Sequence, residues 1–335
     1  MKKLALSLAV STLAMSASAM DPMPPEAGFS GFLAAGASGG QVESNFLAKI
    51  LSIDLSNKDI YKYDSPDQTD IIIPSFGYNF GYTFADTKTR IYIGTAVENS
   101  LDFSSNTVVA VRHDFDSIGN VELAGLAPGA AKLEVWENPY QLGSNRSSTE
   151  RTTSGGRITW DKIFGTDLEF IANVRKVDID DERSGEGLGL TQAQQKLLDR
   201  EGDVTRIELG YAFNFAKENL MVRPSAAYID RDLDGNAMAQ DGYELGVSLT
   251  YDGGKYVWMN RAAYQSLNGD ETNPIFNEKN DADVYMLASE IRVPDPFGWE
   301  NWFTTVGVQW ADNRADIDFN KSSVAMFSAH IGRRF

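Results

Sequence analysis

The chain contains no cysteine, and only two of its 335 residues are histidine, His113 and His330. The lack of cysteine excludes disulfide frameworks and thiolate metal sites. Two histidines leave little room for histidine-based catalysis. Long apolar runs are also missing, because after the first twenty residues no stretch approaches the ~18 apolar residues that a membrane-spanning helix requires. A helical membrane protein is therefore excluded, whereas a closed barrel of strands is not.

Basic residues are scarce relative to acidic ones. The chain has 30 Lys and Arg against 47 Asp and Glu, a formal net charge of −17. So acidic a protein does not suit the phosphate backbone, and we exclude nucleic acid as a partner. Modest overall hydrophobicity does not argue for a soluble protein, because in a membrane barrel only every second strand residue must be apolar.

The first residues have the three parts of a secretory signal peptide. Lys2 and Lys3 are followed by the apolar stretch from Leu4 to Ala14 and by the small residues Ala17-Ser18-Ala19. Cleavage after Ala19 is predicted. The chain then divides into a signal peptide, residues 1–19, and one β-barrel domain, residues 20–335, exported through the oxidising periplasm.

Residues 70–84 alternate between large apolar and small polar side chains. Successive side chains of a strand point to opposite faces, so one face of this segment is aromatic and the other small and polar. Repetition of this pattern in hairpins favours a barrel with lipid outside. The apolar face contains Ile72, Pro74, Phe76, Tyr78, Phe80, Tyr82 and Phe84, and the polar face contains Ser75, Gly77, Asn79, Gly81 and Thr83.

The whole chain gives fourteen candidate strands, which predicts an all-β, antiparallel, up-and-down transmembrane barrel. An even number returns both ends of the chain to one side. Short turns, as at 85–88 or 252–254, would face the periplasm, and long loops, as at 41–69 or 182–202, the outside. Gly125, Pro128 and Gly129 interrupt one strand as a bulge or a break, and a break would leave twelve strands. The candidates are 28–40, 70–84, 89–100, 106–116, 120–136, 150–164, 167–181, 203–216, 219–231, 241–252, 255–267, 282–294, 301–312 and 322–335.

Other strands share the two-faced pattern and allow their register to be assigned. In 203–216 the odd positions face lipid, in 241–252 the odd positions again, and in 301–312 the even positions, with Phe303 as an exception. In 255–267 we point Trp258 outward, which keeps Arg261 in the lumen, because an Arg facing lipid at the midplane costs roughly 2–4 kcal/mol.

The chain ends in a strand with alternate apolar residues, Phe327, Ala329 and Ile331, and a terminal Phe335. This ending resembles the strand that the barrel assembly machinery recognises. Arg333 departs from the usual apolar residue, although a long Arg near an interface can reach water. We therefore expect outer-membrane lipid, lipopolysaccharide and the assembly machinery as partners.

Three segments resemble an uncharacterised family of Gram-negative outer-membrane proteins that is classified only as a domain of unknown function. The resemblance implies an outer-membrane barrel and brings no known activity. The segments are Val135-Trp136-Glu137-Asn138-Pro139-Tyr140 with Gly143-Ser144-Asn145-Arg146, Trp160-Asp161-Lys162-Ile163, and Asn273-Pro274-Ile275-Phe276.

The assigned registers place charged residues of both signs on the lumen wall. About fourteen strands lie between ~8-stranded barrels, which side chains fill, and 16-stranded porins, which hold a channel. One interpretation is a pore whose opposed basic and acidic walls orient polar solutes. The other is that these groups pair across strands and fill the interior. The residues are Arg90, Arg112, Arg157, Arg175, Arg206, Arg223, Arg261 and Arg292 with Glu98, Asp114, Glu134, Asp161, Glu169, Glu208, Glu244 and Glu290.

Two loops carry motifs of their own. Thr191 and Gln194 form a capping-box pattern that opens a short helix in the loop 182–202, which would either narrow the pore or cap it from outside.

Asp230, Asp232 and Asp234, with Gly235 and with Asp241 at the twelfth position, have the spacing of a calcium loop. The alternative is an acidic, solvated turn. Apart from calcium at this loop, we expect no cofactor. A second acidic rim, which would be solvated or would contact lipopolysaccharide through divalent cations, contains Asp178, Asp180, Asp181 and Glu182.

We predict a porin-like channel for passive diffusion of small polar or charged solutes, and no enzyme. A lipid-modifying barrel enzyme would need a His near a Ser or an acid. His330 shares the lumen face with Ser328, whereas His113 would point to lipid. The first alternative is a non-conducting surface barrel whose loops bind a partner or a glycan.

Overall fold

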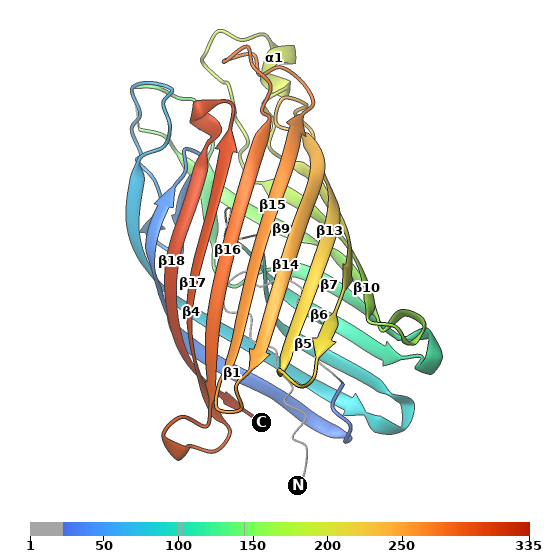
Figure 1. Ribbon diagram of the computed structural model, residues 1–335. Helices are drawn as coiled ribbons and strands as arrows, with labels where there is room; N and C mark the ends of the chain where they lie inside the picture. Colours follow the sequence, from blue (N-terminus) through green and yellow to red (C-terminus); the bar gives the residue numbers. More distant parts are fainter. Residues whose placement is uncertain (1–22, 100, 102, 144) are drawn as a thin grey trace.

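The computed structural model describes residues 23–99, 101, 103–143 and 145–335. The predicted signal peptide therefore lies outside the described residues. Within them, fourteen strands form one closed antiparallel barrel (Figure 1), as predicted. They are β1 (Gly28–Glu43), β4 (Gln68–Phe84), β5 (Thr89–Asn99), β6 (Ser104–Asp114), β7 (Asn120–Pro128), β9 (Ser148–Asp161), β10 (Leu168–Ile179), β11 (Gly202–Tyr211), β13 (Leu220–Leu233), β14 (Gln240–Asp252), β15 (Val257–Gly269), β16 (Ala282–Pro294), β17 (Trp302–Ala315) and β18 (Ser322–Arg334).

The first and last strands close the barrel. β1 pairs with β18 from Phe32↔Arg334 to Glu43↔Ser323, and with β4 on its other side. Each remaining strand pairs with its neighbours along the chain, so the ring of strands is closed, although β4 pairs with β5 only from Asn79↔Gly94 to Phe84↔Thr89. Closure is what allows the strands of a barrel to pair their backbone polar groups in hydrocarbon.

No helix within the described residues has the length and apolarity needed to cross a membrane.

The outer surface is apolar, as the alternation predicted. In β4 the exposed Ile72 and Phe76 alternate with the buried Ile71 and Ile73. The same holds in β15, where Trp258 is exposed and Arg261 is buried in the interior. Large apolar side chains are exposed on every strand of the ring, whereas soluble monomers rarely expose large contiguous apolar patches. The fold is therefore that of a transmembrane barrel.

The connections at the two ends of the barrel differ in length (Figure 1). At the end with the C-terminus they are short, and four of them form the 3₁₀ turns η1 (Ala85–Thr87), η2 (Asp116–Ile118), η3 (Ile163–Gly165) and η4 (Pro296–Gly298). Exposed rings at this short-turn end, such as Phe164 and Phe297, fit an aromatic girdle. The opposite, long-loop end contains α1 (Gln192–Lys196) and η5 (Asp318–Asn320). β12 (Phe213–Phe215) pairs with the start of β13 beside the short turn at 216–219.

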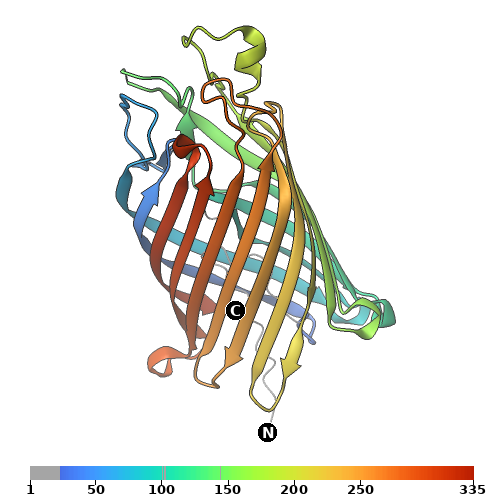
Figure 2. The same ribbon diagram turned by 45° about the horizontal axis from the view of Figure 1, so that its top comes forward.

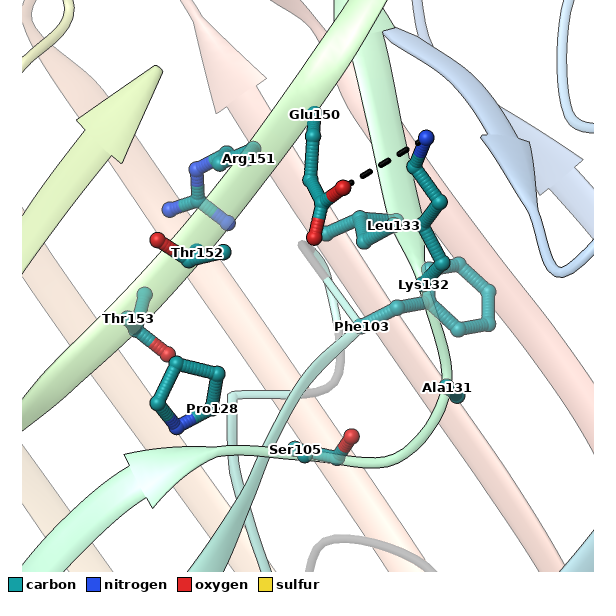
Figure 3. Close-up of a pocket in the computed structure, with 11 residues that line it drawn as sticks. Phe103, Ser105, Pro128, Ala131, Lys132, Leu133, Glu150, Arg151, Thr152 and Thr153 are labelled. Carbon is teal, nitrogen blue, oxygen red and sulfur yellow. Dashed lines mark ion pairs between the residues drawn. The ribbon is translucent and has the colours of Figure 1, made fainter. Parts of the chain in front are cut away.

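The interrupted strand breaks, and the barrel still keeps fourteen strands. β7 ends at Pro128, and after residues 129–132 the chain resumes as β8 (Leu133–Trp136), which pairs with the same strand, β9. Figure 3 shows this site, a cavity of about 30 Å³ flanked by the ion pair of Lys132 and Glu150 at 3.4 Å. The amide Nδ2 of the buried Asn106 donates to the Thr153 backbone oxygen at 2.7 Å. Asn106 thus satisfies a carbonyl that the break leaves without a strand partner.

The first long loop repairs the wall beyond the break. It forms the short strands β2 (Leu47–Ile50) and β3 (Ile53–Asp54), and β2 pairs with β8. Side chains of β2 and β8 pack inward with residues of β1, β4, β10 and β18. This apolar inner core contains Val42, Leu47, Ile50, Leu55, Ile71, Ile73, Leu133, Val135, Ile179, Val324 and Met326.

Six long loops pack together at the long-loop end, where Figure 2 brings them forward. We call this cluster the lid. Its fully buried members are Tyr140, Leu198, Ile317 and Phe319, and the rings of Phe46, Tyr63 and Phe276 contact Phe319 at centroid distances of 5.7, 5.7 and 5.8 Å. The partly buried members are Phe46, Ile60, Tyr63, Leu188, Leu190, Met238, Ile275 and Phe276.

The capping box of α1 is confirmed, and the helix belongs to this end of the barrel. The Thr191 hydroxyl accepts from the Gln194 backbone, and the Gln194 side chain accepts from the Thr191 backbone. Leu198, just beyond α1, is buried in the lid. Of the two readings of loop 182–202, the structure therefore supports the cap over the mouth.

Arg146 holds the lid loops together from inside. It is 1 % exposed, lies 4.4 Å from the Trp136 ring centroid, and donates to the carbonyls of Asn45 at 2.9 Å, Pro139 at 3.1 Å and Asn57. Burial lowers the pKa of the Arg146 guanidinium to about 10, so it is still charged at neutral pH. These bonds join the long loop that follows β1 to the long loop that follows β8.

The β1–β18 seam gives a prediction on barrel stability. A Cβ at Gly40 would lie 1.9 Å from the Ala325 carbonyl oxygen, whereas a Cβ at the adjacent Gly39 has its nearest neighbours at 3.4 Å. Gly40→Ala should cost about 1–3 kcal/mol of unfolding free energy, because the strands must move apart. Urea unfolding in lipid vesicles measures it. Gly39→Ala is the matched control, and equal effects of the two changes would contradict the seam as described.

The lid gives a second prediction. Arg146→Met should loosen the loops by about 2 kcal/mol or more, because several buried carbonyls lose their donor. Chymotrypsin should then cut the lid loops faster while the barrel stays intact. Arg183→Met is the control, because its side chain is 52 % exposed and its carboxylate partners lie at 3.8 Å. Equal cleavage of the wild type and Arg146→Met would show that Arg146 does not hold the lid.

Candidate functional site

The strands position a band of ion pairs on the inner wall from β6 to β16. Because alternate residues point inward, every second position of each strand is available to it. The nitrogen–oxygen distances are 2.7 Å for Arg112–Asp161, 3.6 Å for Arg157–Glu122, 2.8 Å for Arg206–Glu244, 2.8 Å for Arg223–Glu169, 2.6 Å for Arg223–Glu208, 2.7 Å for Arg261–Glu244 and 3.2 Å for Arg292–Glu290.

Arg223 is the centre of this band. Its side chain is fully buried and pairs with Glu169 on β10 and Glu208 on β11. A Cβ at Gly210 would lie 2.5 Å from the guanidinium carbon, so the glycine provides the space that Arg223 occupies. Arg206 pairs with Glu208 as well as with Glu244, which connects Arg223 to Arg261 through alternating charges.

The structure thus brings most of the predicted wall residues together, but as pairs. Acidic and basic side chains alternate along the same wall, so the predicted opposed walls and their transverse field are wrong. The cause is proximity: Glu208 and Arg206 lie two positions apart on one strand, and Arg261 of β15 lies on the strand next to Glu244 of β14. Asp114 is outside this band and accepts the backbone amide of Asp116 at the short-turn end.

Arg175 lines the cavity described below, and three other predicted wall residues also differ from the paired band. Arg90 donates to Asn79 at 3.2 Å near the short-turn end. The side chain of Glu98 falls outside the described residues. Glu134 was assigned wrongly to the lumen, because the break between β7 and β8 shifts the alternation by one. Its neighbours Leu133 and Val135 belong to the inner core, and Glu134 instead contacts Ser148 and Lys132 on the other face.

An inward hairpin tip was not predicted from the sequence. Leu101, between β5 and β6, packs against Ile229, Leu267 and Val284 on the inner faces of β13, β15 and β16. Phe103 packs against the inner core. The available signal was the apolar pair Leu101 and Phe103 in a short turn, where exposed polar residues are usual.

A cavity of about 320 Å³ lies in the lumen beneath the lid. Phe46 and Met238 of the lid line one side of it, and Leu101 of the inward hairpin lines another. Apolar and amide side chains complete the wall. Among the described residues that line the cavity, the charged ones are Glu244 and the arginines Arg151, Arg157, Arg175, Arg200, Arg206, Arg231 and Arg261.

The four carboxylates of the predicted calcium loop are not gathered. Asp230 and Asp241 pair in register across β13 and β14, whereas Asp232 lies opposite Asp203 on β11. Asp234 follows β13, and its backbone amide donates to Glu201. Within the described part of the chain, no three acidic or histidine side chains form a group that could hold a metal ion.

The two histidines have hydroxyl neighbours. His330 faces the lumen, with Nε2 at 2.6 Å from Ser75 Oγ and Nδ1 at 3.4 Å from Thr305 Oγ1. His113, on the lipid face, contacts Thr89 Oγ1 at 2.8 Å and the Phe115 ring. Neither set of described contacts includes the orienting carboxylate that a catalytic triad uses.

The ion-pair band predicts a large stability effect at its centre. Arg223→Met should lower the unfolding free energy by about 3–5 kcal/mol, because Glu169 and Glu208 stay buried without their cation. Adding Glu169→Gln and Glu208→Gln should recover part of the loss. Urea unfolding in vesicles measures both, with the exposed Arg314→Met as control. A loss below about 1 kcal/mol would contradict a central role for Arg223.

Comparison with solved structures finds outer-membrane proteins at low sequence identity. In-vitro folded OmpT of Vibrio cholerae, in trimer form, is 13 % identical, with a TM-score of 0.42, and the match covers 92 % of this chain and 99 % of that one. The outer-membrane channel DcaP of Acinetobacter baumannii is 11 % identical, with a TM-score of 0.44 and coverage of 92 % and 97 %. A FadL homologue of Pseudomonas aeruginosa is 11 % identical, with a TM-score of 0.40 and coverage of 92 % and 88 %.

A search of curated proteins finds no match. A family model described as "Protein of unknown function (DUF2860)" matches residues 28–333, from the start of β1 to the end of β18. This confirms the resemblance to an uncharacterised family of barrels. The chain is a member of the DUF2860 family.

Proposed function

We propose that this protein is an outer-membrane channel for passive diffusion of small polar or charged solutes. The observation that carries the proposal is the cavity of about 320 Å³ in the lumen, lined by guanidinium, carboxylate and amide groups. A barrel that served only as a rigid support would fill this space with side chains, as ~8-stranded barrels do. Polar lining at the centre of a membrane protein costs free energy and is typical of a solute path.

Passage in this proposal requires the lid to move. The cavity lies beneath lid residues Phe46 and Met238, so the path to the long-loop end is covered in this conformation. Loops with few strand contacts open more easily than the barrel wall. The channel is therefore gated by its own long loops.

The ends of the chain support the proposed location. A cleaved signal peptide would export the chain through the periplasm. The outward face of β18, with Phe327, Ile331 and the terminal Phe335 exposed, fits the strand that the assembly machinery recognises. The acidic loop residues at the opposite end would face lipopolysaccharide and its divalent cations.

Recording from planar bilayers tests the proposal. The refolded chain should give discrete conductance steps, and a variant without residues 184–198 should give larger or more frequent ones, because that deletion removes Leu188, Leu190 and Leu198 from the lid. The heat-dependent shift in gel mobility would verify that both variants fold. Absence of conductance in both proteins would reject the channel.

A surface barrel that binds a partner through its loops is the second candidate. The observation in its favour is that the loops fold into an ordered cluster of buried aromatic residues rather than standing apart. In that case the deletion of residues 184–198 would abolish binding of the loops to their partner or glycan and would not raise the conductance. The contacts of His113 and His330 give no comparable support for an enzyme, and we propose none.

A further inference from the structure

We propose that the cavity beneath the lid is a binding site for a small organic anion that has an apolar portion. The inference deepens the proposed channel function, on which it rests, by naming the class of solute. Two features of the lining carry it: the vacant donors of Arg175 and Arg261, and an apolar surface toward the long-loop end.

The arginines occupy two adjacent rungs of the inner wall. On the first, Asn173 of β10 pairs in register with Arg157 of β9 and Arg206 of β11. On the second, Arg175 of β10 pairs with Val204, which in turn pairs with Arg231 of β13. Neighbouring strands are about 4.8 Å apart, so these four guanidinium groups project into the same part of the lumen.

The second rung also leaves room beside its central arginine. The residue opposite Arg175 on β9 is Gly155, which has no side chain. A Cβ there would lie 2.1 Å from the Val174 carbonyl oxygen, so only glycine fits without moving the strand. The strand geometry thus keeps space next to the Arg175 guanidinium.

Several of these cations pair with carboxylates of the wall, and Arg151, Arg157 and Arg231 have further partners. Arg206 and Arg261 share Glu244, Arg157 lies 3.6 Å from Glu122, and Arg200 pairs with Glu182 at 2.7 Å. Arg231 donates to the neutral amide of Gln240 at 2.9 Å.

Arg175 and Arg261 retain donors for a ligand. Among the described residues, none is an ion-pair or hydrogen-bond partner of the Arg175 side chain. Arg261 uses Nη2 for Glu244, whereas its buried Nη1 has no partner there. Planar guanidinium groups bind carboxylate and phosphate oxygens, so each of these arginines can donate to an anion in the cavity.

The lining of the cavity becomes apolar toward the long-loop end. Val177 and Ile179 continue the inward face of β10 from Arg175 toward the long-loop end. Leu47 and Val135 of the inner core face the same space. A wholly polar anion would leave this surface without contacts, whereas a short hydrocarbon portion would bury it. The volume of about 320 Å³ is at the lower end for small-molecule pockets, which limits the ligand to a small one.

Calorimetric titration of the refolded full-length protein in lipid nanodiscs tests the inference. The probes are hexanoate, which has both features, acetate, which lacks the apolar portion, and hexanamide, which lacks the charge. Hexanoate should bind most tightly. Arg175→Gln should weaken its binding about tenfold, because a charge-assisted pair is lost, and Arg175→Lys should retain more of it.

Lys176→Gln is the matched control, because it removes the same charge from the next residue of β10, whose side chain is exposed on the other face. Heat-dependent gel mobility checks that each variant folds. Equal affinity of the wild type and Arg175→Gln for hexanoate would overturn the site. If acetate bound as tightly as hexanoate, the proposed contact with the apolar portion would be wrong. If hexanamide bound as tightly as hexanoate, the proposed contact with the anionic group would be wrong.

Conductance recorded from the same preparations separates the two proposals. A protein that conducts but does not bind hexanoate overturns the anion site alone. One that binds hexanoate in the way described but never conducts overturns the channel and leaves the site in place.

Discussion

Backbone hydrogen bonding in hydrocarbon is the constraint on which this structure depends. A sheet that spans a bilayer must close, and here it closes where β1 meets β18. Where the ladder fails, other groups replace it: the Asn106 amide reaches the Thr153 carbonyl beside the β7–β8 break, and β2 pairs with β8 beyond it. The apolar exterior follows from the same constraint, because closure leaves one face to lipid.

Closure also creates an interior that must be filled, and the chain fills its two sides differently. Toward β18, β1 and β4 the long-loop half is occupied by an apolar core, to which the first loop contributes Leu47 and Leu55. Toward β9–β15 the wall carries buried ion pairs centred on Arg223. The cavity lies where these two sides meet, and its mixed lining follows from that position.

The sequence predicted what depends on a local period. Alternation identified fourteen strands, the lumen position of Arg261 and the outward position of Trp258, because each depends only on residues two apart. The capping box at Thr191 was likewise local. Glu134 was misplaced because the irregular segment between β7 and β8 decides which residues of β8 point inward. The sequence shows that the strand is interrupted, but it does not show how many residues the interruption contains.

The cavity, the lid and the inward hairpin tip could not be predicted in this way. Leu101 meets strands more than a hundred residues later in the chain, and the lid draws on loops from six parts of it. The spacing of residues along the sequence does not indicate such long-range contacts. The family-like segments did point to the lid, since Trp136, Tyr140, Arg146 and Phe276 all belong to it or support it, but the resemblance gave them no role.

The pairing of β2 with β8 has a consequence for the order of assembly. β2 comes from the first loop, yet the strand that it joins is laid against β9, near the middle of the chain. Such a non-local contact forms only after the intervening chain has been ordered, which delays it kinetically. The loop that is synthesised first is therefore among the later ones to reach its final position, and until then β8 has a strand partner on its β9 side alone.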